Sequence, residues 1–348
     1  MRPLLESIFE EQLGFSDGND IELVDGVYIG ETELVAVRAL RQDPTAYDAE
    51  FNRWLTLTYL PDQKLVLDAI LALHYNRQRF ADLCTLAKAN NVVPFVGSGM
   101  SVPCGKRAWS AFLRQLRTQS TLLEVTLEGM LAKGQYEDAA DAVAKAMPAQ
   151  LFDNLIEHEL RLEPTDPVRG AVRLLPGVFE SLVVTTNLDD VLERRFDECG
   201  VPFNKVYAGA AICNHRKDGA ARSLLKLHGD CRDAKTRVLG TAEYDEAYGP
   251  KGAVREELAN VYRNKSLLCL GCSLADDRTV GLMREVAAAD KNNPKHYALC
   301  KVPGDEAERV KREHFLTERN IFPIWYADDH DECIEAVLVG MLREMKKL

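Results

Sequence analysis

Short, almost continuously apolar runs recur along this chain from residue 92 onward, and stretches of helical character separate them. Apolar runs of this length are typical of strands that are buried on both faces, as in a parallel sheet. Strands are expected at 92–97, 181–187, 223–230, 266–274, 296–302 and 322–327, and helices at 109–119, 189–199, 251–264, 277–289 and 305–319. The alternation predicts an α/β fold built on a doubly wound, Rossmann-like parallel sheet.

Two parts of the chain depart from this alternation. A long stretch of helical character separates the first two expected strands, and we expect a helical insertion at about 110–178 that caps the mouth of the sheet. Residues 1–80 carry amphipathic stretches but no catalytic constellation. They are expected to form a mostly helical N-terminal module beside a domain of residues 81–348 that holds the sheet.

One amphipathic stretch, DQKLVLDAILALHYNRQRFADLCTLAKANN, begins at Asp62. Its apolar residues fall near one stripe of a helix, and Asp62 is a plausible N-cap. The stretch ends in Asn90 and Asn91, and asparagine tolerates the left-handed conformation of a helix C-terminus. A helix over this stretch is therefore expected.

Charge and composition exclude several classes of protein. The formal net charge is −11, which argues against a protein that binds the phosphate backbone of nucleic acids. No segment is apolar enough for a membrane span, and the N-terminal residues are too acidic for a signal peptide. We therefore expect a cytoplasmic protein without a membrane partner.

Nine cysteines are scattered along the chain, and the only close pair is Cys269 and Cys272. A structural zinc site of this type needs a second pair, so we expect no zinc and no other metal. Free thiols at the end of a strand are the simpler interpretation, because nothing marks the chain as secreted.

The first stretch with chemical potential is GSGMS, which follows the first expected strand. Gly97 and Gly99 leave the backbone bare, so it can approach a pyrophosphate, and the N–H groups of the turn can hold its oxygens. The hydroxyls of Ser98 and Ser101 can add contacts. A plain turn is at least as good an interpretation of these residues alone.

The second stretch, TTNLDD, follows the next strand and contains Thr186, Asn187 and Asp189. Asparagine or aspartate after a strand is a good N-cap for the helix that follows, which is the structural alternative. An asparagine amide also offers a donor and an acceptor to ribose hydroxyls and to an attacking water. One residue can cap the helix while its neighbour binds a ligand.

Two more strand ends carry polar or small residues. His228 in LHGD is followed by glycine at an expected opening, and imidazole is suited to take a proton from a hydroxyl at neutral pH. A lone histidine is more often structural. The last stretch, GCSL, contains Gly271, Ser273 and Leu274.

These four motifs, in this order and each after a strand, resemble the sirtuin NAD-binding domain. The corresponding sirtuin elements read G-A-G-x-S, T-Q-N-x-D, H-G and G-T-S-L, and the similarity covers about residues 85–330. The sequences of four segments resemble the sirtuin-like NAD hydrolases of bacterial antiphage defence more closely than the deacetylase sirtuins: FVGSGMSVPCGKRAW, TTNLDDVLE, KLHGD and LGCSLADD. The chain lacks the zinc module of deacetylase sirtuins, and it has Arg107 where the defence family prefers proline.

The resemblance implies that NAD is the substrate and that Asn187 and His228 are catalytic. It implies NAD contacts from Gly97, Ser98, Gly99, Ser101, Thr186, Asp189, Gly271, Ser273 and Leu274, with Asp189 orienting the nicotinamide amide. The expected activity is an NAD glycohydrolase that acts by NAD depletion. A protein deacylase and a non-catalytic sensor of NAD or ADP-ribose are the alternatives.

The expected partners follow from two different arguments. The amphipathic helices of residues 1–80 offer apolar stripes that can pack between protomers, so we expect a homo-oligomer. The resemblance implies a separate regulatory partner, a HerA-like ATPase, because the expected catalytic domain runs almost to residue 348.

Overall fold

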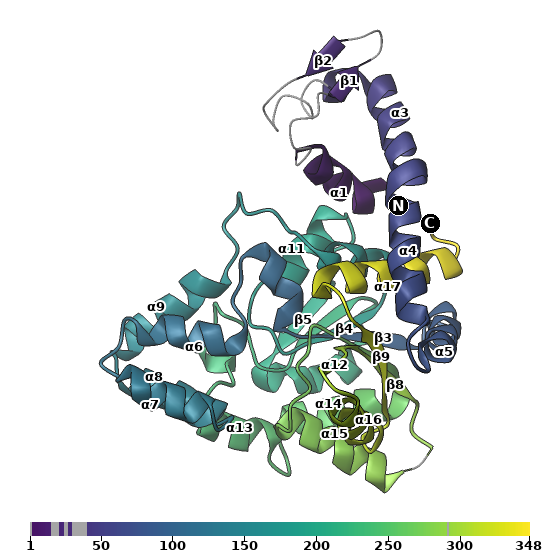
Figure 1. Ribbon diagram of the computed structural model, residues 1–348. Helices are drawn as coiled ribbons and strands as arrows, with labels where there is room; N and C mark the ends of the chain where they lie inside the picture. Colours follow the sequence, from purple (N-terminus) through teal and green to yellow (C-terminus); the bar gives the residue numbers. More distant parts are fainter. Residues whose placement is uncertain (1, 15–20, 24–26, 30–39, 291) are drawn as a thin grey trace.

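A parallel sheet lies at the centre of the structure, a computed structural model that describes residues 2–14, 21–23, 27–29, 40–290 and 292–348 (Figure 1). Within these residues the sheet has seven strands in the order β5-β6-β4-β3-β7-β8-β9, and every neighbouring pair is parallel. The strands are β3 (Val92–Val96), β4 (Leu182–Thr185), β5 (Lys205–Ala208), β6 (Ser223–Lys226), β7 (Ser266–Leu270), β8 (His296–Lys301) and β9 (Ile321–Tyr326).

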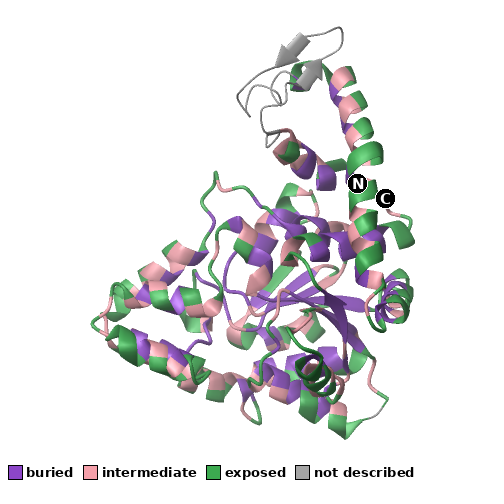
Figure 2. Ribbon diagram, in the orientation of Figure 1, coloured by how far each residue is buried: buried purple, intermediate pink, exposed green. Residues whose placement is uncertain are grey.

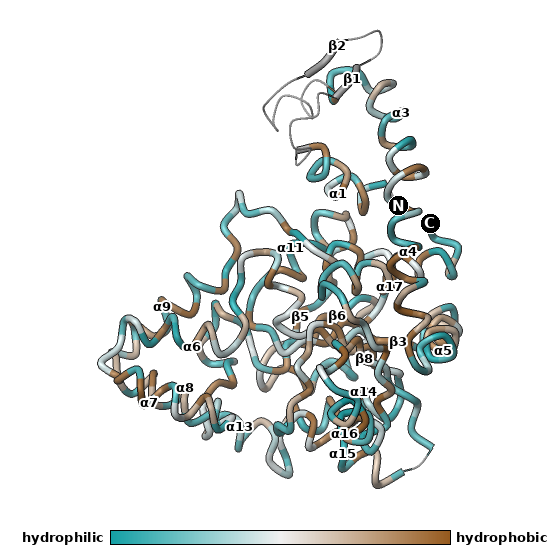
Figure 3. The backbone as a smooth tube through the Cα atoms, in the orientation of Figure 1, coloured by the Kyte–Doolittle hydropathy of each residue, from teal (hydrophilic) through white to brown (hydrophobic). Residues whose placement is uncertain are grey.

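Helices cover both faces of this sheet because its strands are apolar on both sides. Neighbouring residues of one strand enter opposite cores: Val183 packs with one hydrophobic cluster and Val184 with the other. Figure 2 shows the strands buried, and Figure 3 shows hydrophobic residues concentrated in them. The doubly wound, Rossmann-like prediction is therefore confirmed.

The two faces carry different helices. Helices α5 (Asn76–Lys88), α11 (Val191–Glu198) and α17 (His330–Glu344) contribute to the first core. Helices α13 (Thr241–Tyr248), α14 (Ala253–Asn264), α15 (Arg278–Ala289) and α16 (Glu306–Thr317) contribute to the second, with the short helix η4 (Gly209–Asn214). The short helices α12 (His215–Asp218) and η5 (Ala234–Thr236) lie against η4.

The helical insertion has a hydrophobic core of its own. Its helices are α6 (Trp109–Arg117), α7 (Glu124–Leu131), α8 (Tyr136–Lys145) and α9 (Ala149–Leu160). Leu188 and Cys231, from the loops after β4 and β6, are buried in the same cluster. The insertion is therefore packed against two of the loops at the carboxyl edge of the sheet. The chain returns to β4 through η3 (Ala171–Leu174) and α10 (Leu175–Val178).

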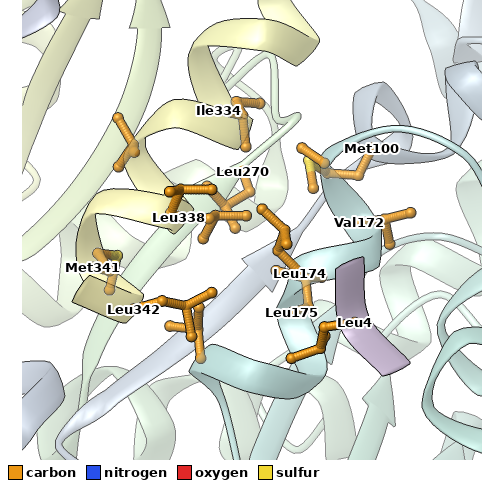
Figure 4. Close-up of a cluster of buried hydrophobic side chains, with 14 of the residues drawn as sticks. Leu4, Met100, Val172, Leu174, Leu175, Leu270, Ile334, Leu338, Met341 and Leu342 are labelled. Carbon is orange, nitrogen blue, oxygen red and sulfur yellow. The ribbon is translucent and has the colours of Figure 1, made fainter. Parts of the chain in front are cut away.

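The N-terminal part is mostly helical, as expected. It comprises α1 (Arg2–Gly14), the antiparallel pair β1 (Ile21–Leu23) and β2 (Val27–Ile29), α3 (Pro44–Trp54), the π-helical turn η1 (Leu55–Tyr59) and α4 (Leu60–Leu71). Leu4 of α1 packs beside Leu342 of α17, and both belong to the first core (Figure 4). Helix α4 lies against α17, where a Cβ at Gly340 would come within 2.5 Å of Leu67.

The long helix expected from Asp62 is interrupted. Helix α4 ends at Leu71, α5 starts at Asn76, and His74 between them has φ +39°. The buried amide of Asn76 donates to the Trp325 carbonyl at 2.7 Å and accepts from the Trp325 amide at 2.9 Å, so the break is tied to β9. The N-cap prediction for Asp62 is wrong, because α4 begins at Leu60; the left-handed prediction for Asn90 is confirmed by its φ of +54°.

Two further differences concern strands. The edge strand β5 has no counterpart in the prediction, because its four residues include the exposed Lys205 and Val206 and lack a continuous apolar run. The expected strands at 181–187 and 223–230 are too long: β4 stops at Thr185 and β6 at Lys226. The residues beyond these ends, at 186–187 and 227–230, therefore lie in loops at the carboxyl edge of the sheet.

Candidate functional site

The carboxyl ends of the central strands meet at one edge of the sheet. Val96 of β3 pairs with Thr185 of β4 and with Leu270 of β7, and Thr185 pairs with Lys226 of β6. The chain goes from β3 to β4 on one side and reaches β7 on the other, so the topological switch point lies at β3, where α/β sheets bind ligands. Two residues beyond these paired positions lie Ser98, Asn187, His228 and Cys272.

The glycines of this edge let two turns pack directly against each other. The Gly97 amide donates to the Leu270 carbonyl at 2.9 Å, and the Gly99 amide donates to the Gly271 carbonyl at 3.0 Å. A Cβ on Gly97 would lie 2.5 Å from the Gly271 oxygen, and Gly271 has φ +65° with Met100 N at 2.5 Å from its own added Cβ. These three glycines therefore have a structural requirement before any ligand is considered.

The turn after β3 is also anchored from inside. Figure 4 shows the Met100 side chain among Leu270, Ile334 and Val172 in the first core. Ser101 is buried, whereas Ser98 beside it is half-buried. The short helix η2 (Ser98–Cys104) thus buries the Ser101 side chain and leaves the Ser98 side chain partly accessible.

Asn187 connects the loop after β4 with this turn. Its Nδ2 donates to the Gly97 carbonyl and to the Ser101 hydroxyl, both at 3.1 Å. Its backbone N–H donates to Thr185 Oγ1 at 2.9 Å, and the residue is 6% exposed. Among the described residues, Oδ1 has no hydrogen-bond partner, so the amide keeps an acceptor at the switch point.

Asp189 and Asp190 follow in the same loop, and both are buried. Burial raises the pKa of Asp189, while Lys226 and a hydrogen bond with Ser101 oppose the shift. Asp189 Oδ1 also accepts from the Val191 amide at 3.2 Å. Asp190 Oδ1 accepts from the Leu162 amide at 2.8 Å, which ties the loop to the end of the insertion.

Lys226, the last residue of β6, lies fully buried beneath this loop. Its ammonium donates to the carbonyls of Leu188 and Asp189 and pairs with Glu193 at 2.9 Å and Asp230 at 2.8 Å. Burial disfavours its charge, but the two carboxylates prevail and raise the pKa of Lys226. The loop that carries Asn187 is thus clamped to β6.

His228 lies two residues beyond Lys226 and is half-buried. Its Nε2 is 2.8 Å from Tyr248 Oη, and its Nδ1 is 3.4 Å from Tyr244 Oη. Burial lowers the pKa of His228 to about 4, so the imidazole is neutral at pH 7. A neutral imidazole has a lone pair with which to accept a proton.

The remaining predicted contact residues differ in exposure. Thr186 is half-buried, and its amide donates to the Val96 carbonyl at 3.2 Å. Ser273 is exposed, and its carbonyl accepts from Arg312 at 2.6 Å. Leu274 has φ +48° and its side chain packs in the second core, so it can offer a ligand its backbone rather than its side chain.

The structure therefore joins part of the predicted set by direct contacts. Gly97, Ser101 and Asn187 are linked by hydrogen bonds, Gly99 and Gly271 pack beside them, and Ser101 opposes the rise that burial causes in the pKa of the nearby Asp189. His228 lies at the same edge because β6 is paired in register with β4, but its hydrogen bonds are with helix α13 and not with these residues.

Two features of the site were not predicted. Lys226 is a charged residue within an otherwise apolar run, SLLKLHGD, and that interruption was the available signal. Tyr244 and Tyr248 stand four residues apart, the spacing that places two rings on one face of a helix. The sequence predicts a role for neither tyrosine, because no helix is expected at 241–248.

All nine cysteines, each within the described part of the chain, are free. Cys269 and Cys272 lie at the end of β7, and burial raises the pKa of both thiols. Among the described residues no group of three or more histidine, cysteine or acidic side chains is arranged to hold a metal ion. None of the described helices is both long and apolar enough to cross a membrane.

A groove of about 430 Å³ lies elsewhere on the molecule, between α14 and α15. It is lined by Arg255, Arg263 and Glu285 among others, and none of the candidate site residues contributes to it.

A family model described as a SIR2-like domain matches residues 181–324. The match spans the chain from just before β4 into β9 and includes Asn187, His228 and Gly271. It does not include the glycine turn after β3. Over this range the chain is similar to SIR2-like domains, and the similarity indicates an activity related to NAD.

Proposed function

We propose that the protein is an NAD glycohydrolase that cleaves NAD to nicotinamide and ADP-ribose. The observation that carries the proposal is the unpaired acceptor oxygen of Asn187 at the switch point. This oxygen lies beside the glycine turn after β3, and His228, which is neutral at pH 7, occupies the equivalent position after β6. The SIR2-like match over the same loops supports NAD as the substrate.

The donor set fits the chemistry of this substrate. Both N–H groups of the Asn187 amide are engaged by the protein, so its oxygen is oriented to accept from a ribose hydroxyl or from the attacking water. His228 takes the proton from that hydroxyl or water. Ser98 and Thr186 are half-buried and can reach the phosphates or ribose, whereas Asp189 is positioned through Ser101 to orient the nicotinamide amide.

The central experiment is chromatography of the products after NAD is incubated with the purified chain. We expect nicotinamide and ADP-ribose from the wild type, and a loss of roughly hundredfold or more in Asn187→Ala and in His228→Ala. Asn264→Ala and His158→Ala are matched controls, because both residues lie outside the site. Wild-type turnover in Asn187→Ala or His228→Ala would refute the assignment.

The same experiment separates the two alternatives. A protein deacylase would consume NAD only with an acylated peptide and would yield an acylated ADP-ribose. A sensor would bind NAD and release no nicotinamide with any partner. Release of free ADP-ribose without a peptide is expected only of the glycohydrolase.

We also propose, from the sequence resemblance, that the protein acts in the cytoplasm as an effector of antiphage defence, controlled by a HerA-like ATPase. Its net charge of −11 is unsuited to direct binding of nucleic acid. Cells that carry both proteins should lose NAD on phage infection, and cells with the Asn187→Ala variant should not. Equal NAD loss in both strains would contradict this role.

Self-association through residues 1–80 belongs to the same proposal. Leu57 and Leu65, on η1 and α4, are 72% and 69% exposed and offer an apolar surface. Leu57→Asp with Leu65→Asp should lower the mass measured by light scattering, while Val125→Asp, at an equally exposed residue of the insertion, should not. An unchanged mass in the double variant would exclude this surface.

A further inference from the structure

The imidazole of His228 is held between two tyrosines of one helix. Tyr244 and Tyr248 stand on the same face of α13, and their rings meet the imidazole edge-on at centroid distances of 5.2 Å and 5.9 Å. Each hydroxyl addresses a different ring nitrogen: Tyr248 is at Nε2 and Tyr244 is at Nδ1.

The two hydroxyls are not equivalent. Tyr248 is buried, lies 2.8 Å from Nε2, and has Thr279 Oγ1 at 2.8 Å on its other side. Tyr244 is half-buried and lies 3.4 Å from Nδ1, at the long end of the hydrogen-bond range. Nε2 therefore belongs to a continuous internal chain, whereas Nδ1 has a weak and partly exposed partner.

The ionisation states of His228 and the two tyrosines determine that the imidazole carries a single proton, on either Nδ1 or Nε2. Burial keeps His228 neutral at pH 7. Burial, together with Asp277 and Glu137, raises the pKa of Tyr244 and Tyr248, so both phenols keep their protons. A neutral imidazole carries one proton, and the hydrogen bond at one nitrogen decides which nitrogen is left as the acceptor.

We infer that Tyr248 is a positioning residue for His228: it accepts a hydrogen bond from Nε2–H and donates its own to Thr279, which leaves the lone pair of Nδ1 for the substrate. Nδ1 then takes the proton from the ribose hydroxyl or the attacking water, while Nε2–H stays bonded to Tyr248. Tyr244 covers Nδ1 in this structure and must move aside when the substrate enters.

Helix α13 is held in place from two sides. It lies between α8 of the insertion and helices α14 and α15 (Figure 1). The Thr241 amide donates to Asp141 of α8 at 3.3 Å, and Arg278 of α15 binds both carboxylate oxygens of Glu137 as well as Asp245 of α13. The position of Tyr248 therefore depends on the insertion as well as on the sheet.

The first test measures the tautomer and does not depend on activity. In the full-length chain labelled with ¹⁵N-histidine, two-bond ¹H–¹⁵N correlations at pH 7 distinguish the two tautomers, and His228→Gln identifies the signals. We expect the Nε2–H tautomer in the wild type and its loss in Tyr248→Phe. Tyr207→Phe, at a buried tyrosine of β5 bonded to Asp218, should keep the wild-type pattern.

An Nδ1–H tautomer in the wild type would overturn the inference, even if Tyr248→Phe failed to fold. An unchanged tautomer in a folded Tyr248→Phe would overturn it as well.

The second test is kinetic and rests on the proposed NAD cleavage. Tyr248→Phe should lower kcat about tenfold to hundredfold with little change in KM, because the imidazole is misoriented and the substrate contacts remain. Thr279→Val should lower kcat less, and Tyr244→Phe should raise kcat/KM by roughly twofold to tenfold, the worth of one hydrogen bond. An effect of Tyr248→Phe on KM alone would contradict the role.

Absence of NAD cleavage by the wild type would refute the proposed function, and the tautomer would still decide this inference.

Discussion

Replacing Lys226 by methionine tests whether the clamp under the candidate site stabilises the protein. The ammonium is fully buried and pairs with Glu193 and Asp230. After the substitution Asp230 keeps its two contacts with Arg232, at 2.8 Å and 2.9 Å, whereas Arg232 lies 3.8 Å from Glu193. Glu193 is therefore the carboxylate that loses its close partner and keeps only the longer contact with Arg232.

The expected loss follows from the state that Glu193 must adopt. A buried carboxylate without a partner takes up a proton, and protonating a glutamate of ordinary pKa at pH 7 costs about 3.7 kcal/mol. Removal of one partner from a buried ion pair generally lowers the free energy of unfolding by about 3–5 kcal/mol, which agrees with this value. We expect Lys226→Met to lower the free energy of unfolding by about 3–5 kcal/mol at pH 7.

The loss should depend on pH in a definite direction. In the variant the folded state binds a proton at Glu193 that the unfolded state releases above its ordinary pKa, so stability falls as the pH rises. The deficit relative to wild type should therefore shrink by about 1.4 kcal/mol per unit between pH 7 and pH 5. Adding Glu193→Gln to Lys226→Met should recover most of the loss.

Urea denaturation followed by circular dichroism at pH 7 and pH 5 measures these differences. Lys205→Met is the matched control, because the ion pair of Lys205 with Asp218 is exposed to solvent and should change the stability little. A deficit below about 1 kcal/mol for Lys226→Met, or a deficit independent of pH, would refute the reasoning.

Three further predictions concern the turns, the buried histidines and metal. Gly271→Ala should destabilise the protein, because its Cβ would lie 2.5 Å from Met100 N at φ +65°, whereas Gly304→Ala, with open space around it, should be nearly neutral in the same denaturation experiment. Burial lowers the pKa of His228 to about 4 and of His296 to about 3, so unfolding binds extra protons and stability should fall as the pH drops below about 6.5, less so in His296→Gln. Elemental analysis should find less than one zinc per chain, and a chelator should leave the melting temperature unchanged; one tightly bound zinc would contradict the expectation.

The order of the strands' apolar runs was sufficient to predict the class of fold. A run buried on both faces must be covered on both faces, and helices between the runs are the elements that can do so. The same argument predicted that the candidate site residues lie at one edge, since the residues after β3, β4, β6 and β7 share the carboxyl edge of any parallel sheet with this connectivity. These properties depend on residues that are close in the sequence, and local patterns report them.

The pairing of distant residues could not be inferred in this way. The sequence offers two explanations for Gly97, a plain turn or a ligand that approaches the backbone, and only the structure shows this turn in contact with the turn of Gly271. Asn187 was expected to offer both a donor and an acceptor, but its donor is engaged by Gly97 and Ser101, and only its acceptor remains. Each result depends on the register of strands that are far apart in the chain.

The environment of His228 was likewise decided by the tertiary structure. The motif LHGD places an imidazole after a strand, but it says nothing of the helix that begins at Thr241 and brings two phenols to its ring nitrogens. Likewise, the sequence alone does not explain Lys226 within an apolar run. The structure explains it, because Glu193 and Asp230 pair with its ammonium. Periodicity and spacing determine which faces are buried, whereas the pKa and the partner of a buried polar group depend on what the rest of the chain packs against it.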